Sequence, residues 1–359
     1  RVVHAGGSAT GRRILRQLSA KVVEEPQIEV REGRRVVALA TDDGRCTGVF
    51  LDDGTSAQAR AVVLAAGGGA ALWQRTTNPA GATGSGLALA HAAGALLADL
   101  EFVQFHPTAL VTARGHDGFL LSEALRGEGA RLLGADGERF VDELAPRDHV
   151  AVAIDRVLRA QPESTVHLDL RDVELGRFPN ITATLLAEGL DPARQPIAVA
   201  PAAHYVMGGI ATDLDGRSSL PGLYAAGECA CTGLHGANRL ASNSLAECLV
   251  FGRRAGLAAT GEPPVTNADP APATPEALAP TPETRRRLWE HAGLHRTGDG
   301  LRRLLDDPFP LARLIARSAL ARAESRGAHR RDDHPATDHR LDGRHFVVTA
   351  AGPQLEHWT

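Results

Sequence analysis

The stretch of sequence that decides the fold is Leu220-Pro-Gly-Leu-Tyr-Ala-Ala-Gly-Glu228, followed six residues later by His235-Gly-Ala-Asn-Arg-Leu-Ala-Ser-Asn-Ser-Leu245. Its apolar part, 223–226, predicts a short buried strand that ends at Gly227-Glu228, where the backbone can approach a ligand and a carboxylate can accept hydrogen bonds from hydroxyl groups. Ser242-Asn243-Ser244 then precedes a predicted helix, 245–259, whose free N-terminal amides suit an electron-rich or anionic group. A strand, a loop and a capped helix occur in many α/β proteins. This stretch differs from them in having Arg239 between the carboxylate of Glu228 and the predicted helix cap at 242–244.

Length and composition predict a soluble globular protein of more than one domain. The chain has 359 residues, of which 43% are hydrophobic and 23% charged, and a formal net charge of -4. Two to three domains are expected at roughly 150 residues each, and the net charge provides no basic surface for nucleic acid. No apolar run approaches the ~18 residues of a membrane span, and no signal peptide is recognisable. The four cysteines lack a paired metal-ligand spacing, so we expect no metal site and a reduced, cytoplasmic enzyme.

A second buried strand is predicted at 61–66, where Ala-Val-Val-Leu-Ala-Ala runs into Gly67-Gly68-Gly69. A glycine loop after a strand can let the backbone pass close to a dinucleotide, although a tight turn is an equally good interpretation of the triplet alone. Further strands are predicted at 28–30, 35–40 and 47–51, the last of which ends in a hairpin turn. The two buried strands are expected to share one sheet.

The middle of the chain has the pattern of a separate α+β segment that begins near Leu100. Alternation places Phe102, Gln104 and His106 on one face of a strand, which is expected to end at the Pro-Thr that follows the histidine. Ser122 is a suitable N-cap for a short helix. The other elements predicted in this segment are a hairpin at 131–141, helices at 147–159 and 181–190, and a strand at 166–170.

The last hundred residues are predicted to be a linker followed by helices. Residues 264–282 are rich in Pro, Ala and Thr, a composition that cannot bury enough surface to become ordered. Helical patterns then recur at 283–291, 300–306 and 311–324.

These motifs resemble those of a known family. The segment 220–256 is similar to the flavin-closing segment of the succinate dehydrogenase and fumarate reductase flavoprotein superfamily, and 239–245 resembles its L-aspartate oxidase branch. The resemblance covers nearly the whole chain and implies an α/β fold: a Rossmann-like FAD-binding domain, incomplete at the N-terminus, with an inserted α+β capping domain and a C-terminal helical domain. The implied bounds are 1–99 and 206–263 for the FAD-binding domain, 100–205 for the capping domain, 264–282 for the linker and 283–359 for the helical domain.

The glycine fingerprint of a dinucleotide-binding fold is not found at the start of the sequence. Such a fold should open with a strand, Gly-x-Gly-x-x-Gly and a helix, whereas this sequence opens with a turn-rich lead at 1–11 and a predicted helix at 12–21. We therefore expect that on the order of 100 residues precede this sequence, since one βαβ unit alone takes ~30 or more. The chain as given is accordingly expected to bind FAD poorly.

The resemblance implies which residues form the site. FAD, held non-covalently, is expected to contact Val36, Gly67, Gly68, Ser85, Glu228, Ser244 and Leu245, with Ser85 standing where the branch is expected to carry Asp. The substrate is expected to contact His106, Ser122, Glu123, His204 and Arg239. The catalytic residues are expected to be Arg147, Glu123 and His106. Taken singly, His106 is more often structural and Arg147 would be a solvated charge at a helix end.

The predicted site residues are together suited to a dicarboxylic acid. Such a substrate must be bound at both ends by cationic or hydrogen-bonding groups, and the forked guanidinium of Arg binds a carboxylate bidentately. By resemblance, Arg239 and His204 hold one carboxylate, while His106 and Ser122 hold the other. Such clamping positions the substrate carbon for hydride transfer.

The implied reaction is the FAD-dependent oxidation of L-aspartate to iminoaspartate, the first step of de novo NAD biosynthesis, with oxygen or fumarate as acceptor. Arg147 resembles the family's proton donor and acceptor, and because Arg holds its proton tightly, Glu123 is expected to act as a relay. Functional coupling to quinolinate synthase is also implied. Two alternatives stay open: a succinate dehydrogenase or fumarate reductase flavoprotein, and a catalytically dead fragment that cannot hold FAD.

Overall fold

The computed structural model describes residues 10–113, 115–160, 163–266, 269–277, 279–349 and 351–358, so residues 1–9 of the lead predicted at 1–11 lie outside the described residues. The chain divides into two compact units. The first unit combines Arg1–Arg34 with His106–Ala202, and the second combines Arg35–Phe105 with Ala203–Thr359. The unit boundaries near 105 and 203 lie a few residues from the predicted bounds of the capping domain. Residues up to Arg34, which we had expected to belong to the FAD-binding domain, group with the first unit.

The first unit is built on a four-stranded sheet in the order β6-β9-β8-β7, and its strands are β6 (Val103–Leu110), β9 (Ile197–Val206), β8 (Val166–Asp169) and β7 (Arg131–Leu133). Its helices are α3 (Glu123–Gly127), α4 (Arg147–Ala160) and α5 (Pro179–Ala187). The core between them contains apolar side chains from both layers, among them Leu132, Ile154, Leu168, Leu185 and Ile197. The predicted helix 147–159 and strand 166–170 are thereby confirmed within a residue or two.

Strand β6 continues past the point where the sequence predicted its end. His106, Pro107 and Thr108 are all within the strand, and each is buried. Proline cannot donate to a β-ladder, but β6 is the edge strand of its sheet, where that loss is tolerated. The expectation that the strand stops at Pro107 is therefore wrong.

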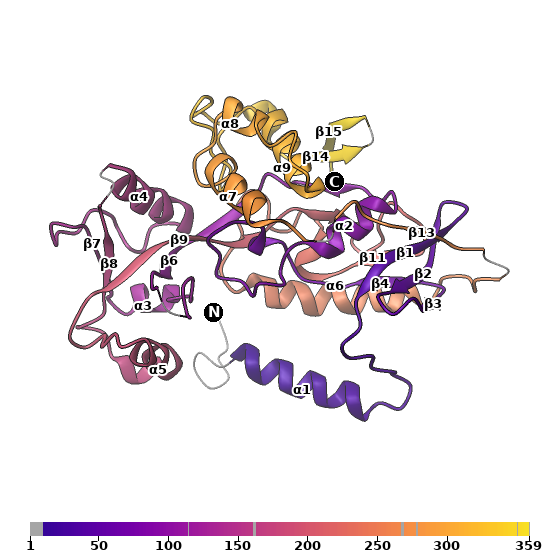
Figure 1. The fold of residues 1–359 in the computed structure, drawn as a ribbon, viewed down its shortest axis with the longest axis horizontal. Helices are drawn as coiled ribbons and strands as arrows, with labels where there is room; N and C mark the ends of the chain where they lie inside the picture. The colour runs from indigo at the N-terminus through magenta and orange to yellow at the C-terminus, as the bar shows by residue number, and fades with distance from the viewer. Residues whose placement is uncertain are drawn as a thin grey trace. The chain divides into compact units, whose positions relative to one another are not determined.

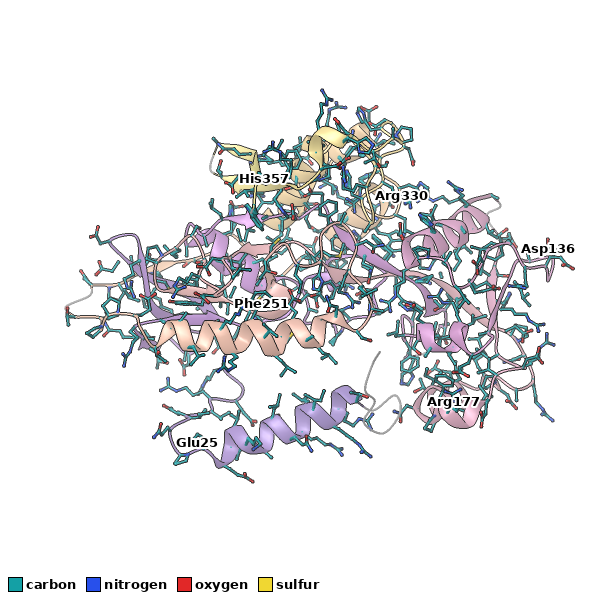
Figure 2. All side chains as sticks on the ribbon, turned by 180° about the vertical axis from the view of Figure 1, so that it is seen from behind. Glu25, Asp136, Arg177, Phe251, Arg330 and His357 are labelled. Atoms are coloured by element: carbon teal, nitrogen blue, oxygen red, sulfur yellow. The ribbon has the colours of Figure 1, made fainter. Side chains whose placement is uncertain are left out.

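Helix α1 (Thr10–Glu24) confirms the helix predicted at 12–21, and it has no buried residue. Figure 2 shows its side chains on the ribbon, with Glu25 labelled just past its end. Leu15 is 65% exposed and Val23 is 75% exposed. The strand predicted at 28–30 is wrong, because those residues are not part of any strand.

The second unit contains the strand pair that the sequence analysis predicted. Strand β4 (Val62–Leu64) pairs in parallel with β11 (Leu223–Ala225), with Val63 opposite Tyr224. Helix α6 (Asn243–Ala259) packs against both strands, as Figure 1 shows. The two predicted strands thus share one sheet, but only β11 is buried throughout, since Val63 of β4 is 41% exposed. The loops after the two strands emerge at the same edge because the strands are parallel.

A four-stranded antiparallel sheet, β13-β1-β2-β3, precedes this pair, with β1 at Val36–Asp42, β2 at Arg45–Leu51 and β3 at Ser56–Gln58. Its outer strand, β13 (Ala271–Ala273), lies in the segment that we had predicted to be an unordered linker. Leu39 of β1 pairs with Ala273, so that part of the linker expectation is wrong. Pro272 is acceptable here because β13 is an edge strand.

The third sheet of the second unit has the order β12-β10-β5-β14-β15. Its strands are β12 (Ala230–Cys231), β10 (Gly209–Ala211), β5 (Leu97–Ala98), β14 (Arg344–Thr349) and β15 (Gly352–His357). The run of small residues at 87–98 favours a single helix, but α2 spans only Ser85–Ala92 and β5 follows it.

Three helices precede the last hairpin: α7 (Pro282–His291), α8 (Gly298–Arg302) and α9 (Pro310–Ala321). Helices α7 and α9 match the patterns predicted at 283–291 and 311–324, whereas α8 covers only the first three residues of the pattern at 300–306. The β14–β15 hairpin shows that the C-terminal segment is not wholly helical. Within the described part of the chain, none of the helices has the length and apolar character needed to cross a bilayer.

A buried ionic cluster fixes the C-terminal segment to the start of β6. Arg322 is fully buried and donates to Glu101 at 2.6 Å and to Glu324 at 3.0 Å. Its guanidinium lies 4.6 Å from the ring centroid of Phe102 and 4.9 Å from that of Phe346. Burial raises the pKa of Glu101 to about 7, although the charge of Arg322 opposes the shift.

Gly208 allows the backbone of β10 to approach that of Asp99. A Cβ at this position would lie 2.3 Å from the Asp99 carbonyl oxygen, an atom that cannot move without shifting the strand. We expect Gly208→Ala to lower the free energy of unfolding by about 1–3 kcal/mol, as overpacking does. Gly256→Ala is the matched control, because its Cβ would meet nothing within 4 Å on α6, and it should stabilise slightly. Thermal melting checks both, and equal melting of Gly208→Ala and wild type would contradict the packing described.

Candidate active site

The carboxylate of Glu228 lies directly against the glycine loop that follows β4. A Cβ built on Gly68 would fall 2.1 Å from Glu228 Oε1, so the side chain occupies the space that glycine leaves. The backbone N–H of Val206 donates to the same oxygen at 3.0 Å. The two predicted cofactor-binding residues, one on each loop, are therefore in contact.

Burial raises the pKa of Glu228 to about 7, while the hydrogen bond from Val206 and the charge of Arg239 act in the opposite direction. Within the pH range of most enzymes, this carboxyl group therefore lies near its titration midpoint.

That shift predicts a pH dependence of stability in the flavin-free protein. A carboxyl group whose pKa is raised on folding binds its proton more tightly in the folded state, so stability is lost as the pH rises from about 4.5 to about 7. Glu228→Gln removes the charge, and we expect it to melt a few degrees above wild type at about pH 8 and equally at about pH 4.5. A difference in melting temperature that is the same at both pH values would contradict this.

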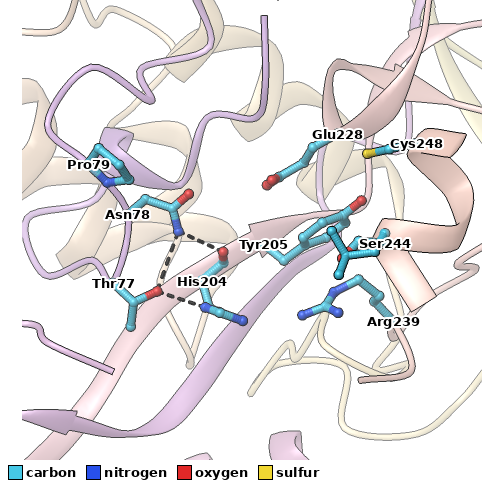
Figure 3. A pocket seen from close by; sticks show the side chains of 10 residues that line it. Thr77, Asn78, Pro79, His204, Tyr205, Glu228, Arg239, Ser244 and Cys248 are labelled. Atoms are coloured by element: carbon cyan, nitrogen blue, oxygen red, sulfur yellow. Dashed lines mark hydrogen bonds between the residues drawn. The ribbon is translucent and has the colours of Figure 1, made fainter. Parts of the chain in front are cut away.

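A cavity of about 310 Å³ opens in the second unit beside Glu228. Figure 3 shows the side chains that line it, which are Thr77, Asn78, Pro79, His204, Tyr205, Glu228, Arg239, Ser244, Leu245 and Cys248. Five of the residues predicted for cofactor or substrate are in this set.

The start of helix α6 faces this cavity through Ser244 and Leu245. Ser242, which precedes the helix, has a φ of 66° and makes no side-chain hydrogen bond to cap it. The helix therefore begins without a capping side chain, and an uncapped helix start attracts electron-rich groups because its first amides lack intrahelical acceptors. An uncapped helix start, a partly buried carboxylate and a glycine loop in one place fit a flavin dinucleotide.

Arg239 is only 6% exposed and is held on two sides. Its guanidinium lies 4.4 Å from the ring centroid of Tyr205, and its Nη2 donates to Gln104 Oε1 at 3.2 Å. Gln104 Nε2 in turn donates to the Arg239 carbonyl at 2.8 Å and to Asn238 Oδ1 at 2.9 Å. The arginine thus presents a positive charge at the cavity wall with a defined orientation.

His204 contributes the second polar group of the same wall. Its Nδ1 lies 2.7 Å from Thr77 Oγ1, and Asn78 Nδ2 donates to its carbonyl oxygen at 2.7 Å, as the dashed lines in Figure 3 show. These contacts fix the imidazole on β9 next to the cavity. Arg239 and His204 together can bind a carboxylate by charge-assisted hydrogen bonds.

The remaining predicted cofactor residues do not line this cavity. Val36 is the first residue of β1, in the β13-β1-β2-β3 sheet, where it pairs with Leu51. Gly67 adopts a φ of 71° in the exposed loop after β4. Ser85 is the first residue of α2 and is partly exposed.

The first unit brings together a second group of predicted residues. Arg147, at the start of α4, donates through Nε to Glu123 Oε2 at 2.6 Å. Arg126 Nη2 lies 4.0 Å from the same oxygen, and its guanidinium is buried with its Nη1 bonded to the Glu143 carbonyl. Burial lowers the pKa of Arg126. Glu123 is therefore placed between two guanidinium groups, one of which the sequence analysis did not assign.

His106 and Ser122 belong to the same unit. His106 is fully buried in β6, and its Nδ1 accepts a hydrogen bond from the Thr108 N–H at 3.2 Å. Ser122 precedes α3 as its N-cap residue, although its hydroxyl makes no capping hydrogen bond.

The residues that hold Arg239 and His204 in place were not predicted from the sequence. Gln104 had been placed on the same strand face as His106, and Tyr205 directly follows His204, so weak signals existed for both. Thr77 and Asn78 lie in a loop without any pattern, and nothing in the sequence ties them to His204.

Comparison with known proteins agrees with this architecture. The family described as "FAD binding domain" matches residues 1–245, and the family described as "Fumarate reductase flavoprotein C-term" matches residues 304–357. The chain is similar to the L-aspartate oxidase of Caulobacter vibrioides, with 48% identity over 371 residues that cover 94% of this chain and 71% of the relative. It is also similar to the L-aspartate oxidase of Agrobacterium fabrum, with 44% identity over 98% of this chain and 73% of the relative.

Solved structures of fumarate reductases have a similar fold. The match to E. coli quinol fumarate reductase has a TM-score of 0.83 and 30% identity, and covers 97% of this chain and 74% of that one. A quinol-fumarate reductase with menaquinol molecules matches with a TM-score of 0.85 and 31% identity, covering 99% of this chain and 77% of that one.

Proposed function

This chain belongs to the L-aspartate oxidase family of FAD-dependent flavoproteins, and from that premise we propose that it oxidises L-aspartate to iminoaspartate, the first step of de novo NAD biosynthesis, with oxygen or fumarate as acceptor. The observation that carries the proposal is the wall formed by Arg239 and His204 in the same cavity as Glu228 and the uncapped start of α6. In this cavity, two side chains that can bind a carboxylate lie beside groups that suit a flavin.

We propose that FAD is held non-covalently by Glu228, by the glycine loop at Gly67-Gly68 and by the amides at Ser244-Leu245. The chemistry that bound FAD supplies is hydride acceptance from Cα of L-aspartate, with the two electrons passed on to oxygen or fumarate. A carboxylate accepts hydrogen bonds from hydroxyl groups, and helix-start amides stabilise negative charge. Val36 and Ser85 remain proposed contacts on the strength of family resemblance.

The proposed substrate clamp has two halves. Arg239 and His204 bind one carboxylate of L-aspartate, which is supported by the fixed orientation of both side chains. His106 and Ser122 are proposed to bind the other carboxylate. Holding both ends removes rotational freedom from the substrate, and such positioning can supply several kcal/mol of barrier lowering.

Arg147 is proposed to hold and transfer the proton of the reaction. Oxidation of the amine removes one proton besides the hydride, and the reverse reduction of fumarate requires one proton to be delivered to carbon. The contact of 2.6 Å between Arg147 and Glu123 supports the carboxylate as the group that exchanges this proton with the arginine. Arg126 places a second positive charge on the other side of Glu123, with its Nη2 4.0 Å from the same carboxylate oxygen.

We further propose a cytoplasmic location and functional coupling to quinolinate synthase. The four cysteines are free thiols, as expected in a reducing compartment. Iminoaspartate is an imine that water hydrolyses, so rapid transfer to the enzyme that condenses it would limit the loss.

Product analysis tests the proposal. With L-aspartate and oxygen, the holoenzyme should release ammonia and oxaloacetate, the hydrolysis products of iminoaspartate, in equal amounts and with equimolar hydrogen peroxide. With reduced dye and fumarate it should form succinate. Oxidation of succinate without any oxidation of L-aspartate would favour the alternative, a succinate dehydrogenase or fumarate reductase flavoprotein.

A further inference from the structure

We propose that Tyr205 is a positioning residue that fixes the guanidinium of Arg239 for its carboxylate, and that Glu247 and His235 hold the tyrosine ring in place. The inference rests on the proposed function, because it assumes that Arg239 binds the substrate. The orientation of Arg239 is nevertheless a separate question from whether Arg239 binds the substrate.

Tyr205 supports Arg239 through the face of its ring. The guanidinium carbon lies 4.4 Å from the ring centroid, within the range of a favourable cation–π contact. Both side chains are buried, with 5% and 6% of their surface exposed, so water screens the contact little. A contact with the ring face uses none of the guanidinium N–H groups, so these can donate to other groups, as Nη2 does to Gln104. Figure 3 shows the two side chains next to each other at the cavity.

The tyrosine ring is itself anchored by a buried carboxylate. The Tyr205 hydroxyl donates to Glu247 Oε2 at 2.9 Å, and His235 Nε2 lies 2.7 Å from the same oxygen. The His235 ring also meets the Tyr205 ring edge-on, with centroids 5.3 Å apart. Glu247 is on α6, His235 precedes Arg239 in the loop, and Tyr205 ends β9, so three elements converge on one ring.

This anchoring strengthens the cation–π contact. A phenol that donates to a carboxylate gains electron density in its ring, which increases the attraction for a cation above the face. Burial and the charge of Glu247 also raise the pKa of Tyr205, so the hydroxyl keeps its proton and remains a donor.

The test is a double-mutant cycle on the holoenzyme, with succinate binding measured by calorimetry. We expect Tyr205→Leu to raise the dissociation constant about tenfold, and Tyr205→Phe, which keeps the ring face, to change it less than about threefold. In the Arg239→Leu background, Tyr205→Leu should have no further effect. For L-aspartate turnover, Tyr205→Leu should raise KM more than it lowers kcat, the pattern of lost binding.

Tyr224 provides the matched control. It is a second buried tyrosine whose hydroxyl donates to a glutamate, Glu262, at 2.6 Å, and Arg217 lies 6.0 Å from its ring. It does not line the cavity. Tyr224→Phe should leave the dissociation constant for succinate unchanged. If Tyr205→Leu does not fold, Glu247→Gln is tested instead. We expect Glu247→Gln to weaken succinate binding about threefold, because the Tyr205 ring beneath Arg239 would be held less firmly.

Each outcome decides a different point. If Arg239→Leu binds succinate as wild type does, the proposed clamp fails, and the positioning role of Tyr205 fails with it. If Arg239→Leu weakens binding while Tyr205→Leu or its substitute Glu247→Gln does not, the clamp stands and the positioning role is overturned. Independent, additive losses in the double variant would also overturn it, since they would mean that Tyr205 acts on the ligand by another route.

Discussion

Arg147→Lys is expected to reduce fumarate reduction to the level of the background reaction while leaving dicarboxylate affinity nearly unchanged. Lysine keeps the positive charge but lacks the forked guanidinium group. It therefore has no N–H at the position from which Arg147 Nε donates to Glu123 at 2.6 Å. Proton transfer by a positioned side chain typically contributes about 10²–10⁴ in rate. We expect kcat to fall by a factor in that range, with the dissociation constant for succinate within about threefold of wild type.

Arg159→Lys is the control for this prediction. Arg159 is at the other end of α4, and its exposed side chain pairs with the buried Asp155 at 2.5 Å. The same exchange is therefore made on the same helix without touching Glu123. Its turnover should equal that of wild type. Normal fumarate reduction by Arg147→Lys would remove Arg147 from the proton-transfer role.

Arg239→Leu should damage aspartate oxidation and fumarate reduction alike, because the carboxylate that it binds is common to both substrates. A buried charge-assisted hydrogen bond contributes roughly 1.5–3 kcal/mol, or about one to two powers of ten in affinity. A bidentate contact favours the upper end of that range. Titration of succinate into the holoenzyme measures the effect directly.

The competing explanation is that Arg239 only fixes its loop through Gln104. In that case, the variant would melt at a lower temperature and bind succinate with an unchanged dissociation constant. The carboxylate-binding role predicts the opposite, weakened binding with similar melting. Arg254→Leu serves as the control, because Arg254 is exposed on α6 and also lies over an aromatic ring, that of the buried Phe251. This change should affect neither property.

Local patterns were sufficient to predict the central part of the fold. Apolar runs that end in glycine predicted both β4 and β11, and their parallel pairing confirms that they share a sheet. The helix α6 was predicted from the Ser-Asn-Ser before its apolar run, and its start lies within two residues of the predicted one. In these places, the residues that set the structure are neighbours in the sequence.

The wrong expectations concern edge strands, where pairing depends on distant residues. Ala271–Ala273 has the composition of a linker, and only the open edge of β1 makes it a strand. A proline is unfavourable inside most strands, but Pro107 is tolerated in β6 because β6 is an edge strand of its sheet. Neither edge is visible to a sequence pattern, since it is created by the sheet as a whole.

In the candidate site, too, the residues within a local motif could be predicted, whereas their partners from distant parts of the sequence could not. Arg239, His204 and Glu228 could be named from their motifs, and all three line one cavity. The partners that orient them could not, because Tyr205 and Gln104 meet Arg239 across 34 and 135 positions of sequence.

The proposed function requires that L-aspartate gives up a hydride at this site. The most direct measurement is anaerobic mixing of the oxidised holoenzyme with L-aspartate while the flavin absorbance is followed. L-aspartate should bleach the flavin in a single turnover, fumarate or oxygen should then restore the absorbance, and succinate should bleach it far more slowly. Bleaching by succinate with no response to L-aspartate would contradict the proposed function.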